Sequence, residues 1–179
     1  MIPALENQET IDVVSTYDEA YAKLKTLRAT RLAAFKPKLF EAMKQAGLGY
    51  ARVEFDGSGD SGSVTGIFAG PEDGTILNDL PDFAIDYTTF SYDMAPTAPC
   101  DKETGHEKPP GYRIIATTKP MAFVDILEDI FWDLIGRRHG GWENNDGAYG
   151  ECRFDAIDGT ITLEVNERYT DYHYHEYEF

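Results

Sequence analysis

The chain has 179 residues, 42% of them hydrophobic, and a formal net charge of −16 at pH 7. This length and apolar content suit one folded domain and argue against global disorder. The acidic balance argues against direct binding to nucleic acid or to a membrane surface, because both are anionic, and it favours a basic protein partner or a cation.

Residues 1–15 are predicted to form a loose polar lead. They have neither the basic start nor the apolar run of a secretion signal. No stretch of the chain reaches 18 apolar residues, so no membrane span is expected. Cys100 and Cys152 are interpreted as free thiols in a reducing cytoplasm.

A first helix is predicted to begin after Thr16, which with Glu19 forms a capping box, and to end at Gly47. Pro37 is expected to kink or divide it. The seven basic residues of the first 49 all lie between Lys23 and Lys44. They indicate either a solvated helix face or a basic binding stripe.

Alternating residues predict strands over 50–55, 64–68, 84–92 and 112–117. A Gly-rich loop, residues 56–62, follows the first of these. The polar, Pro-rich segment 96–111 is expected to be a mobile surface loop.

A second helix is predicted from Pro120 to about Arg138. Its wet side carries four acidic residues at spacings of three and four, which we interpret as a candidate partner-binding stripe: Asp125, Glu128, Asp129 and Asp133. The alternative is that Arg137, or basic residues of the first helix, neutralise this stripe within the fold.

A C-terminal hairpin is the clearest local prediction. Asp158-Gly159 is typical of a two-residue type I′ turn, which would place Phe154 opposite Leu163 and Arg153 opposite Glu164. Residues 171–179 alternate again and predict a further strand.

Two groups of residues are candidate sites. The loops 56–62 and 142–151 would form a polar pocket if they met, which the sequence leaves open; its residues would be Asp56, Asp60, Asn144 and Asp146. A His-x-His-Glu segment has a spacing suited to a metal ion; its residues are His173, His175 and Glu176. The alternative readings are turn chemistry for the loops and an exposed aromatic edge strand for the tail. No cofactor is predicted.

These elements predict a single α+β domain over residues 1–179. An antiparallel sheet would end in the C-terminal hairpin, and two amphipathic helices would pack on one of its faces.

Two segments, FDGSGDSG and GGWENNDGAYGE…DGTITLEVNERYTD, resemble an uncharacterised, mostly proteobacterial family of unknown function whose members are often carried on plasmids or mobile elements. The resemblance implies a bacterial cytoplasmic setting, and because the family has no established activity it carries over no catalytic residues.

For function we predict a non-enzymatic, acidic protein-binding module. It would act as an inhibitor that mimics DNA and occupies the basic nucleic-acid-binding site of a defence enzyme, in the manner of an anti-CRISPR or anti-restriction protein. The alternatives are an immunity protein against a nuclease toxin, a metal-dependent enzyme using the C-terminal His-x-His-Glu, and an acidic protein with no mimicry.

Overall fold

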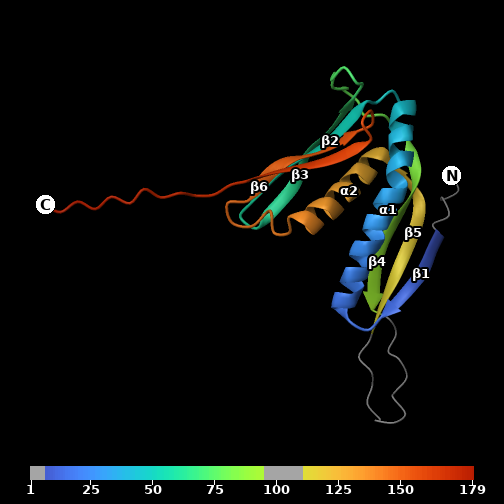
Figure 1. The fold of residues 1–179 in the computed structure, drawn as a ribbon, viewed down its shortest axis with the longest axis horizontal. Helices are drawn as coiled ribbons and strands as arrows, with labels where there is room; N and C mark the ends of the chain where they lie inside the picture. Colours follow the sequence, from blue (N-terminus) through green and yellow to red (C-terminus); the bar gives the residue numbers. More distant parts are fainter. Residues whose placement is uncertain (1–6, 95–110) are drawn as a thin grey trace, which may run out of the picture. The chain divides into compact units, whose positions relative to one another are not determined.

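The computed structural model describes residues 7–94 and 111–179 (Figure 1). The expected mobile loop, 96–111, lies outside the described residues except for Gly111. The chain, for which the sequence predicts one domain, groups into two compact units. The first comprises residues 1–42 and 81–126, and the second comprises residues 43–80 and 127–179. The described elements have α+β composition, with two helices and two antiparallel sheets where one sheet was expected.

The first unit contains a three-stranded antiparallel sheet in the order β1-β5-β4. Its strands are β1 (Asn7–Val14), β4 (Ala84–Met94) and β5 (Tyr112–Ala122). The presence of β1 corrects the expectation of a loose lead over residues 1–15. Six of its eight side chains are exposed, so the strand has no alternating apolar pattern and is held by its backbone ladder to β5.

Helix α1 (Tyr17–Gln45) begins with the predicted capping box. The Thr16 N–H donates to Glu19 Oε2 at 3.2 Å, and the Glu19 N–H donates to Thr16 Oγ1 at 3.2 Å. The helix continues through Pro37, so of the two expected effects, a kink or a division, the division does not occur. Gly47, with φ +76°, follows its end as predicted.

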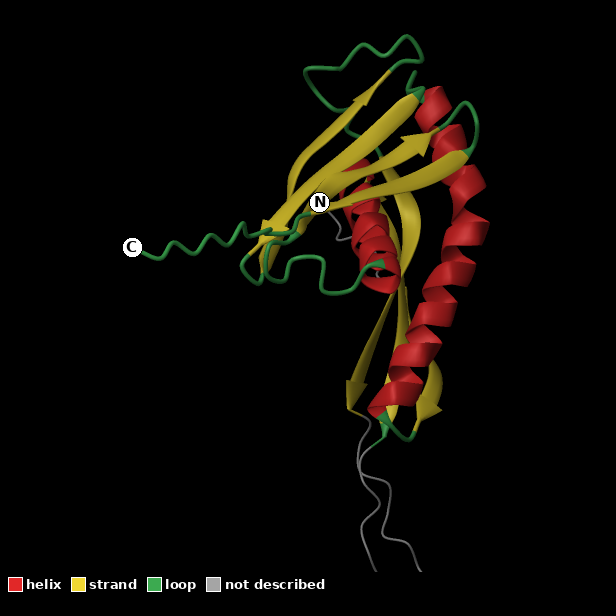
Figure 2. Cartoon of the chain, turned by 60° about the vertical axis from the view of Figure 1, so that its left-hand side comes forward, coloured by secondary structure: helices red, strands yellow, loops and turns green. Residues whose placement is uncertain are grey.

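Helix α1 runs along the strands of the first unit (Figure 2). Ala20 and Leu24 are buried together with Ile114 of β5. Farther along, two arginines reach β4, an edge strand: Arg28 Nη2 donates to the Phe90 carbonyl at 3.2 Å, and Arg31 Nη1 donates to the Thr88 carbonyl at 3.0 Å. These two of the seven basic residues of this helix therefore make contacts within the first unit.

The second unit contains a four-stranded antiparallel sheet in the order β3-β2-β6-β7. Its strands are β2 (Tyr50–Ser58), β3 (Ser61–Gly70), β6 (Ala148–Asp155) and β7 (Thr160–Glu167). Val53, Phe55, Cys152 and Phe154 are buried and share one face of this sheet. On that face Phe55 packs against Phe131 of the second helix, with ring centroids 5.0 Å apart.

Helix α2 (Phe123–Arg138) starts three residues later than predicted. Pro120 lies in β5, opposite Asp86 of β4, because the strand continues up to the residue before the helix. The Phe123 N–H donates to the Phe83 carbonyl at 2.9 Å. Proline therefore marks the end of a strand here, and the helix begins beyond it.

The C-terminal hairpin is present, but its predicted register was wrong. Phe154 lies opposite Ile161, and Cys152 lies opposite Leu163. The shift is by two residues, so every side chain keeps its expected face. Its effect on the other face is larger, because Glu151 now lies opposite Glu164.

The register follows from a turn of four residues, 156–159. A type I′ turn needs positive φ at both central residues, and of the predicted pair Gly159 alone has it, at +65°. Asp155 Oδ1 instead accepts the N–H groups of Ile157 and Asp158, both at 3.0 Å. Ala156 lies in the turn, and its N–H donates to the Gly49 carbonyl on the β2 side at 2.9 Å.

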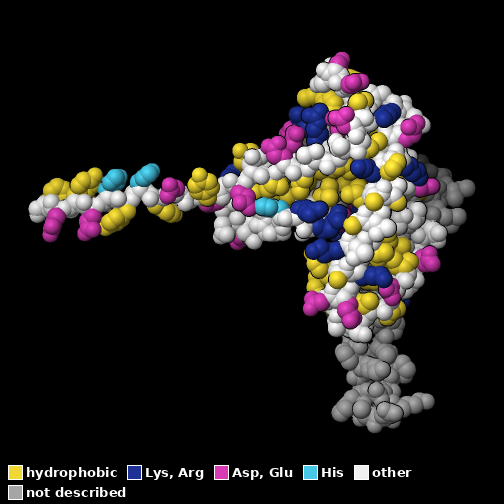
Figure 3. All heavy atoms as spheres, in the orientation of Figure 1, with side chains coloured by type: hydrophobic (Ala, Val, Ile, Leu, Met, Phe, Trp, Pro, Cys, Tyr) yellow, Lys and Arg dark blue, Asp and Glu magenta, His cyan; other side chains and the backbone are white. Residues whose placement is uncertain are grey.

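Residues 168–179 form no strand, which corrects the expectation of a further one over 171–179. The segment is extended, and its aromatic, histidine and acidic side chains project into open space (Figure 3). Tyr172 and Tyr174 are 84% and 80% exposed. The prediction rested on the alternating residue pattern of 171–179 alone. In the structure this segment pairs with no strand of the two described sheets.

Candidate functional site

The loops 56–62 and 142–151 meet in the second unit. The Gly59 N–H donates to the Asn145 carbonyl at 2.9 Å, and the Asp60 N–H donates to the Glu143 carbonyl at 3.1 Å. Asp60 and Asn145 both have positive φ, at +68° and +55°. The backbones of the two loops thus join side by side, which answers the question that the sequence left open.

The four polar side chains predicted for this junction do not converge on one pocket. Asn144 and Asp146 line a small cavity of about 180 Å³, where Asp146 Oδ1 accepts the Thr170 hydroxyl at 2.9 Å. Asp56 lines a different groove. Asp60 is exposed and lines neither of these two cavities. Their residue types suit turn conformations, so the junction is mainly a structural one.

The larger polar feature of the second unit is a groove of about 620 Å³, lined mainly by residues of the sheet face opposite Cys152 and also by Phe55 and Gly150. We call it the acidic groove and define it by its four carboxylates: Glu54, Asp56, Glu151 and Glu164. Tyr149 and Asn166 also line it. Residues of all four strands line the acidic groove, because Thr65 of β3 joins those of β2, β6 and β7.

Three of these carboxylates form one row across the sheet. Glu54 lies directly opposite Glu151, which in turn lies directly opposite Glu164. Neighbouring strands are about 4.8 Å apart, so three like charges fall within about 10 Å. Like charges directly opposite each other destabilise a sheet. Like charges also face each other one pair along this face, where Arg52 lies directly opposite Arg153, but the glutamate row is longer and spans three strands.

Basic side chains flank the acidic groove without filling it. Arg52 Nη2 lies 3.0 Å from Glu54 Oε1. Arg168 donates to both oxygens of Asp56 at 2.9 Å, and these hydrogen bonds hold the pKa of Asp56 below its ordinary value of 3.8. The other two carboxylates of the acidic groove belong to Glu151 and Glu164. Glu164 Oε1 accepts a hydrogen bond from the Asn166 side-chain amide at 3.1 Å.

The acidic stripe predicted on α2 is not a continuous exposed surface. Asp133 is buried and its carboxylate forms an ion pair with Arg137 at 2.7 Å, so it cannot meet a partner there. Glu128 is half-buried and accepts the Trp132 indole N–H at 3.2 Å. Asp125 is exposed and Asp129 half-buried. The alternative, that Arg137 neutralises part of the stripe, applies at Asp133.

The residues predicted to bind metal, His173, His175 and Glu176, all lie exposed in the extended tail. Within residues 7–94 and 111–179, no group of three or more His, Cys, Asp or Glu side chains is placed to hold a metal ion. Cys152 is buried on the apolar face, and burial raises the pKa of its thiol to about 12. It is therefore unsuited to act as a nucleophile.

The glutamate row was missed at the sequence level because it depends on strand order and register. Glu54 and Glu151 are far apart in the chain, and the expected register placed Arg153 opposite Glu164. The observed register makes Thr162 the partner of Arg153. Both the correct turn length and the pairing of β2 with β6 would have been needed to predict the row.

No helix among the described residues is long and apolar enough to cross a membrane. No curated protein and no solved structure shows significant similarity to this chain. A model of a family of unknown function, DUF6878, matches residues 32–105 and 110–179. Because these two segments make up well over half of its length, the chain belongs to the DUF6878 family, whose function is unknown.

Proposed function

We propose that this protein is a non-enzymatic binding module that uses the acidic groove to hold a basic protein partner. The observation that carries the proposal is the row of Glu54, Glu151 and Glu164 on adjacent strands. A fold under selection for stability alone gains from Lys or Thr at the middle position. Local arrangements that work against stability are expected at functional sites.

The chemistry of the groove suits a cationic side chain. A Lys or Arg of a partner that enters between two glutamates forms charge-assisted hydrogen bonds and relieves their repulsion. Tyr149 lines the same groove, and the Arg168 guanidinium lies 4.6 Å from the centre of its ring, so the groove already contains a contact of the kind that a partner's arginine would make. The net charge of −16 adds a long-range field that steers a basic partner towards the protein and weakens with salt.

The partner class that best fits this charge is a protein with a basic nucleic-acid-binding site. Such sites carry Lys and Arg to match the phosphates, and a carboxylate surface can meet the same cations. We propose an inhibitor of a defence enzyme, of the anti-CRISPR or anti-restriction type, which would suit the mobile-element setting that the resemblance implies. An immunity protein against a nuclease toxin has the same charge requirement.

The test compares two acidic surfaces that lose the same charge. One variant combines Glu151→Gln with Glu164→Gln in the groove; the matched control combines Asp125→Asn with Glu128→Gln on α2. The probe is a deca-arginine peptide, with binding measured by calorimetry at 50 mM and 300 mM NaCl.

We expect the groove variant to weaken binding by about 5- to 30-fold at low salt, and the α2 variant to change it by less than about twofold. An equal loss in both variants would show that only net charge matters and would overturn the groove as the site. The same two variants are then tested against partners isolated from the native host. If the protein mimics a nucleic acid, duplex DNA should also displace it from such a partner.

A further inference from the structure

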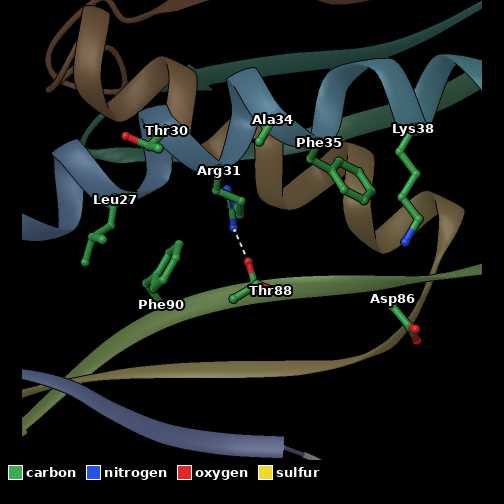
Figure 4. Close-up of a pocket in the computed structure, with 9 residues that line it drawn as sticks. All are labelled: Leu27, Thr30, Arg31, Ala34, Phe35, Lys38, Asp86, Thr88 and Phe90. Atoms are coloured by element: carbon green, nitrogen blue, oxygen red, sulfur yellow. Dashed lines mark hydrogen bonds between the residues drawn. The ribbon is translucent and has the colours of Figure 1, made fainter.

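A second cavity, in the first unit, differs from the acidic groove in its charge and lining. It has a volume of about 390 Å³ and lies between one face of α1 and strand β4 (Figure 4). This volume falls within the range of small-molecule sites. Its lining residues are Leu27, Thr30, Arg31, Ala34, Phe35, Lys38, Asp86, Thr88 and Phe90.

The walls of this cavity are mainly apolar. Leu27 and Phe35 come from α1 and Phe90 comes from β4, and Figure 4 shows their side chains facing the space between the two elements. Phe35 is fixed by edge-to-face packing on Tyr87, with ring centroids 4.8 Å apart. The aromatic wall is therefore held in place without a ligand, which lowers the entropic cost of binding one.

Two cations lie on the α1 side of the same cavity. Arg31 is only 9% exposed; its Nη1 donates to the Thr88 carbonyl at 3.0 Å, and its guanidinium lies 4.5 Å from the centre of the Tyr87 ring. Lys38 is exposed and lies seven residues farther along the helix, about 10.5 Å away along its axis. The carboxylate on the opposite wall is Asp86, so the lining has a net charge of +1 in a chain of net charge −16.

We infer that this cavity binds a small amphipathic anion: one carboxylate or other anionic head group on an aliphatic or aromatic body. The apolar walls take the body, and Lys38, reinforced by the fixed charge of Arg31, takes the head group. A neutral apolar molecule would contact the apolar walls but not the cations. An inorganic anion would pair with the cations but not contact the walls. This inference is independent of the acidic groove, which lies in the other unit.

The experiment uses the full chain and two probes of equal length, octanoate and 1-octanol. Binding is followed by amide chemical shifts in ¹⁵N–¹H spectra. We expect octanoate to move the amide signals of the cavity residues on α1 and β4, with a dissociation constant of about 0.1–1 mM. 1-Octanol should bind at least about threefold more weakly. Equal binding of the two probes, or no shift at 5 mM octanoate, would overturn the inference.

Two pairs of variants test the location. Ala34→Trp fills the cavity and should abolish octanoate binding, whereas Ala33→Trp, on an exposed position outside the lining, should not. Lys38→Glu should weaken octanoate at least about threefold, whereas Lys44→Glu, with the same change in net charge, should leave it unchanged. Retained binding in the Ala34→Trp protein would place the ligand elsewhere.

An acidic, aromatic peptide is the competing occupant. A synthetic peptide of residues 169–179 tests it, because this segment combines tyrosines with Asp and Glu. If the peptide moves the same amide signals while octanoate does not, the cavity is a peptide site and the small-molecule inference is wrong.

Discussion

The Trp142 indole fills the space that a side chain on Gly62 would occupy: a Cβ added to Gly62 would overlap ring atoms Cη2, Cζ3 and Cζ2. Gly57 lies directly opposite Gly62 in the β2–β3 ladder and meets the same ring. Trp142 is 6% exposed and also packs edge-to-face on Phe55 at 5.1 Å. The two glycines therefore make room for the tryptophan, and the two segments that carry the family resemblance are packed together.

A Gly62→Ala change should lower the free energy of unfolding by about 1–3 kcal/mol, because the indole ring must move to admit the methyl group. The measurement is urea unfolding followed by tryptophan fluorescence. Gly136→Ala is the matched control: Gly136 is exposed within α2 and has open space around its Cα. It should stabilise the protein by about 0.5–1 kcal/mol, since alanine favours a helix. A Gly62→Ala protein as stable as the original would contradict this packing.

Replacement of the central glutamate should make the sheet more stable. Glu151→Lys turns two like-charge pairs, with Glu54 and Glu164, into two attractive ones. We expect a gain of about 0.5–1 kcal/mol in the free energy of unfolding, and a smaller gain for Glu151→Gln. The gain in stability of the Glu151→Lys protein over the original should shrink as NaCl rises towards 1 M, because salt screens exposed charges. A loss of stability in both variants would show that the row is already compensated.

The ion pair with Arg168 should lower the pKa of Asp56 in the folded protein. Because the folded pKa lies below the ordinary value of 3.8, the contribution of the pair to stability is present above pH 3.8 and is lost as pH falls through the folded pKa. Carboxyl ¹³C chemical shifts should show a midpoint below 3.8 for Asp56 and a rise towards 3.8 in Arg168→Gln. Asp93, whose pKa is lowered by Arg113, should keep its midpoint in the same variant. An unchanged Asp56 midpoint would contradict the role of Arg168.

Cys152 should stay unreactive in the folded protein. In a Cys100→Ser background, we expect no labelling by a disulfide reagent at pH 8 until guanidinium unfolds the chain. Burial raises the pKa of the Cys152 thiol from 9.0 to about 12, so the unfolded chain loses this proton first. The resulting stability is intact below about pH 9 and declines as pH rises from 9 to 12. Rapid labelling at pH 8 would show that the thiol is accessible.

Local patterns predicted most of the elements. The capping box at Thr16 and the strand that starts at Tyr50 depend on residues near one another in sequence, and both are present. What local patterns missed depends on tertiary partners. Residues 7–14 pair with β5 without an apolar pattern of their own.

The candidate sites show the same division. The register error came from a single turn: Asp158-Gly159 fits a type I′ turn in isolation, but in the structure Asp155 accepts the N–H groups of Ile157 and Asp158 within a longer turn. That error concealed the glutamate row. The burial of Asp133 was likewise hidden, because helical spacing places a carboxylate on a face without saying which side chains cover it.

The arginines that extend from α1 to β4 also affect how accessible the edge of β4 is to another strand. An edge strand with open carbonyls is a template for another chain, and Arg28 and Arg31 occupy the carbonyls of Phe90 and Thr88 at that edge. An incoming strand must displace both guanidinium groups before it can pair there. Helix α1 thus hinders the addition of another strand along the edge of β4.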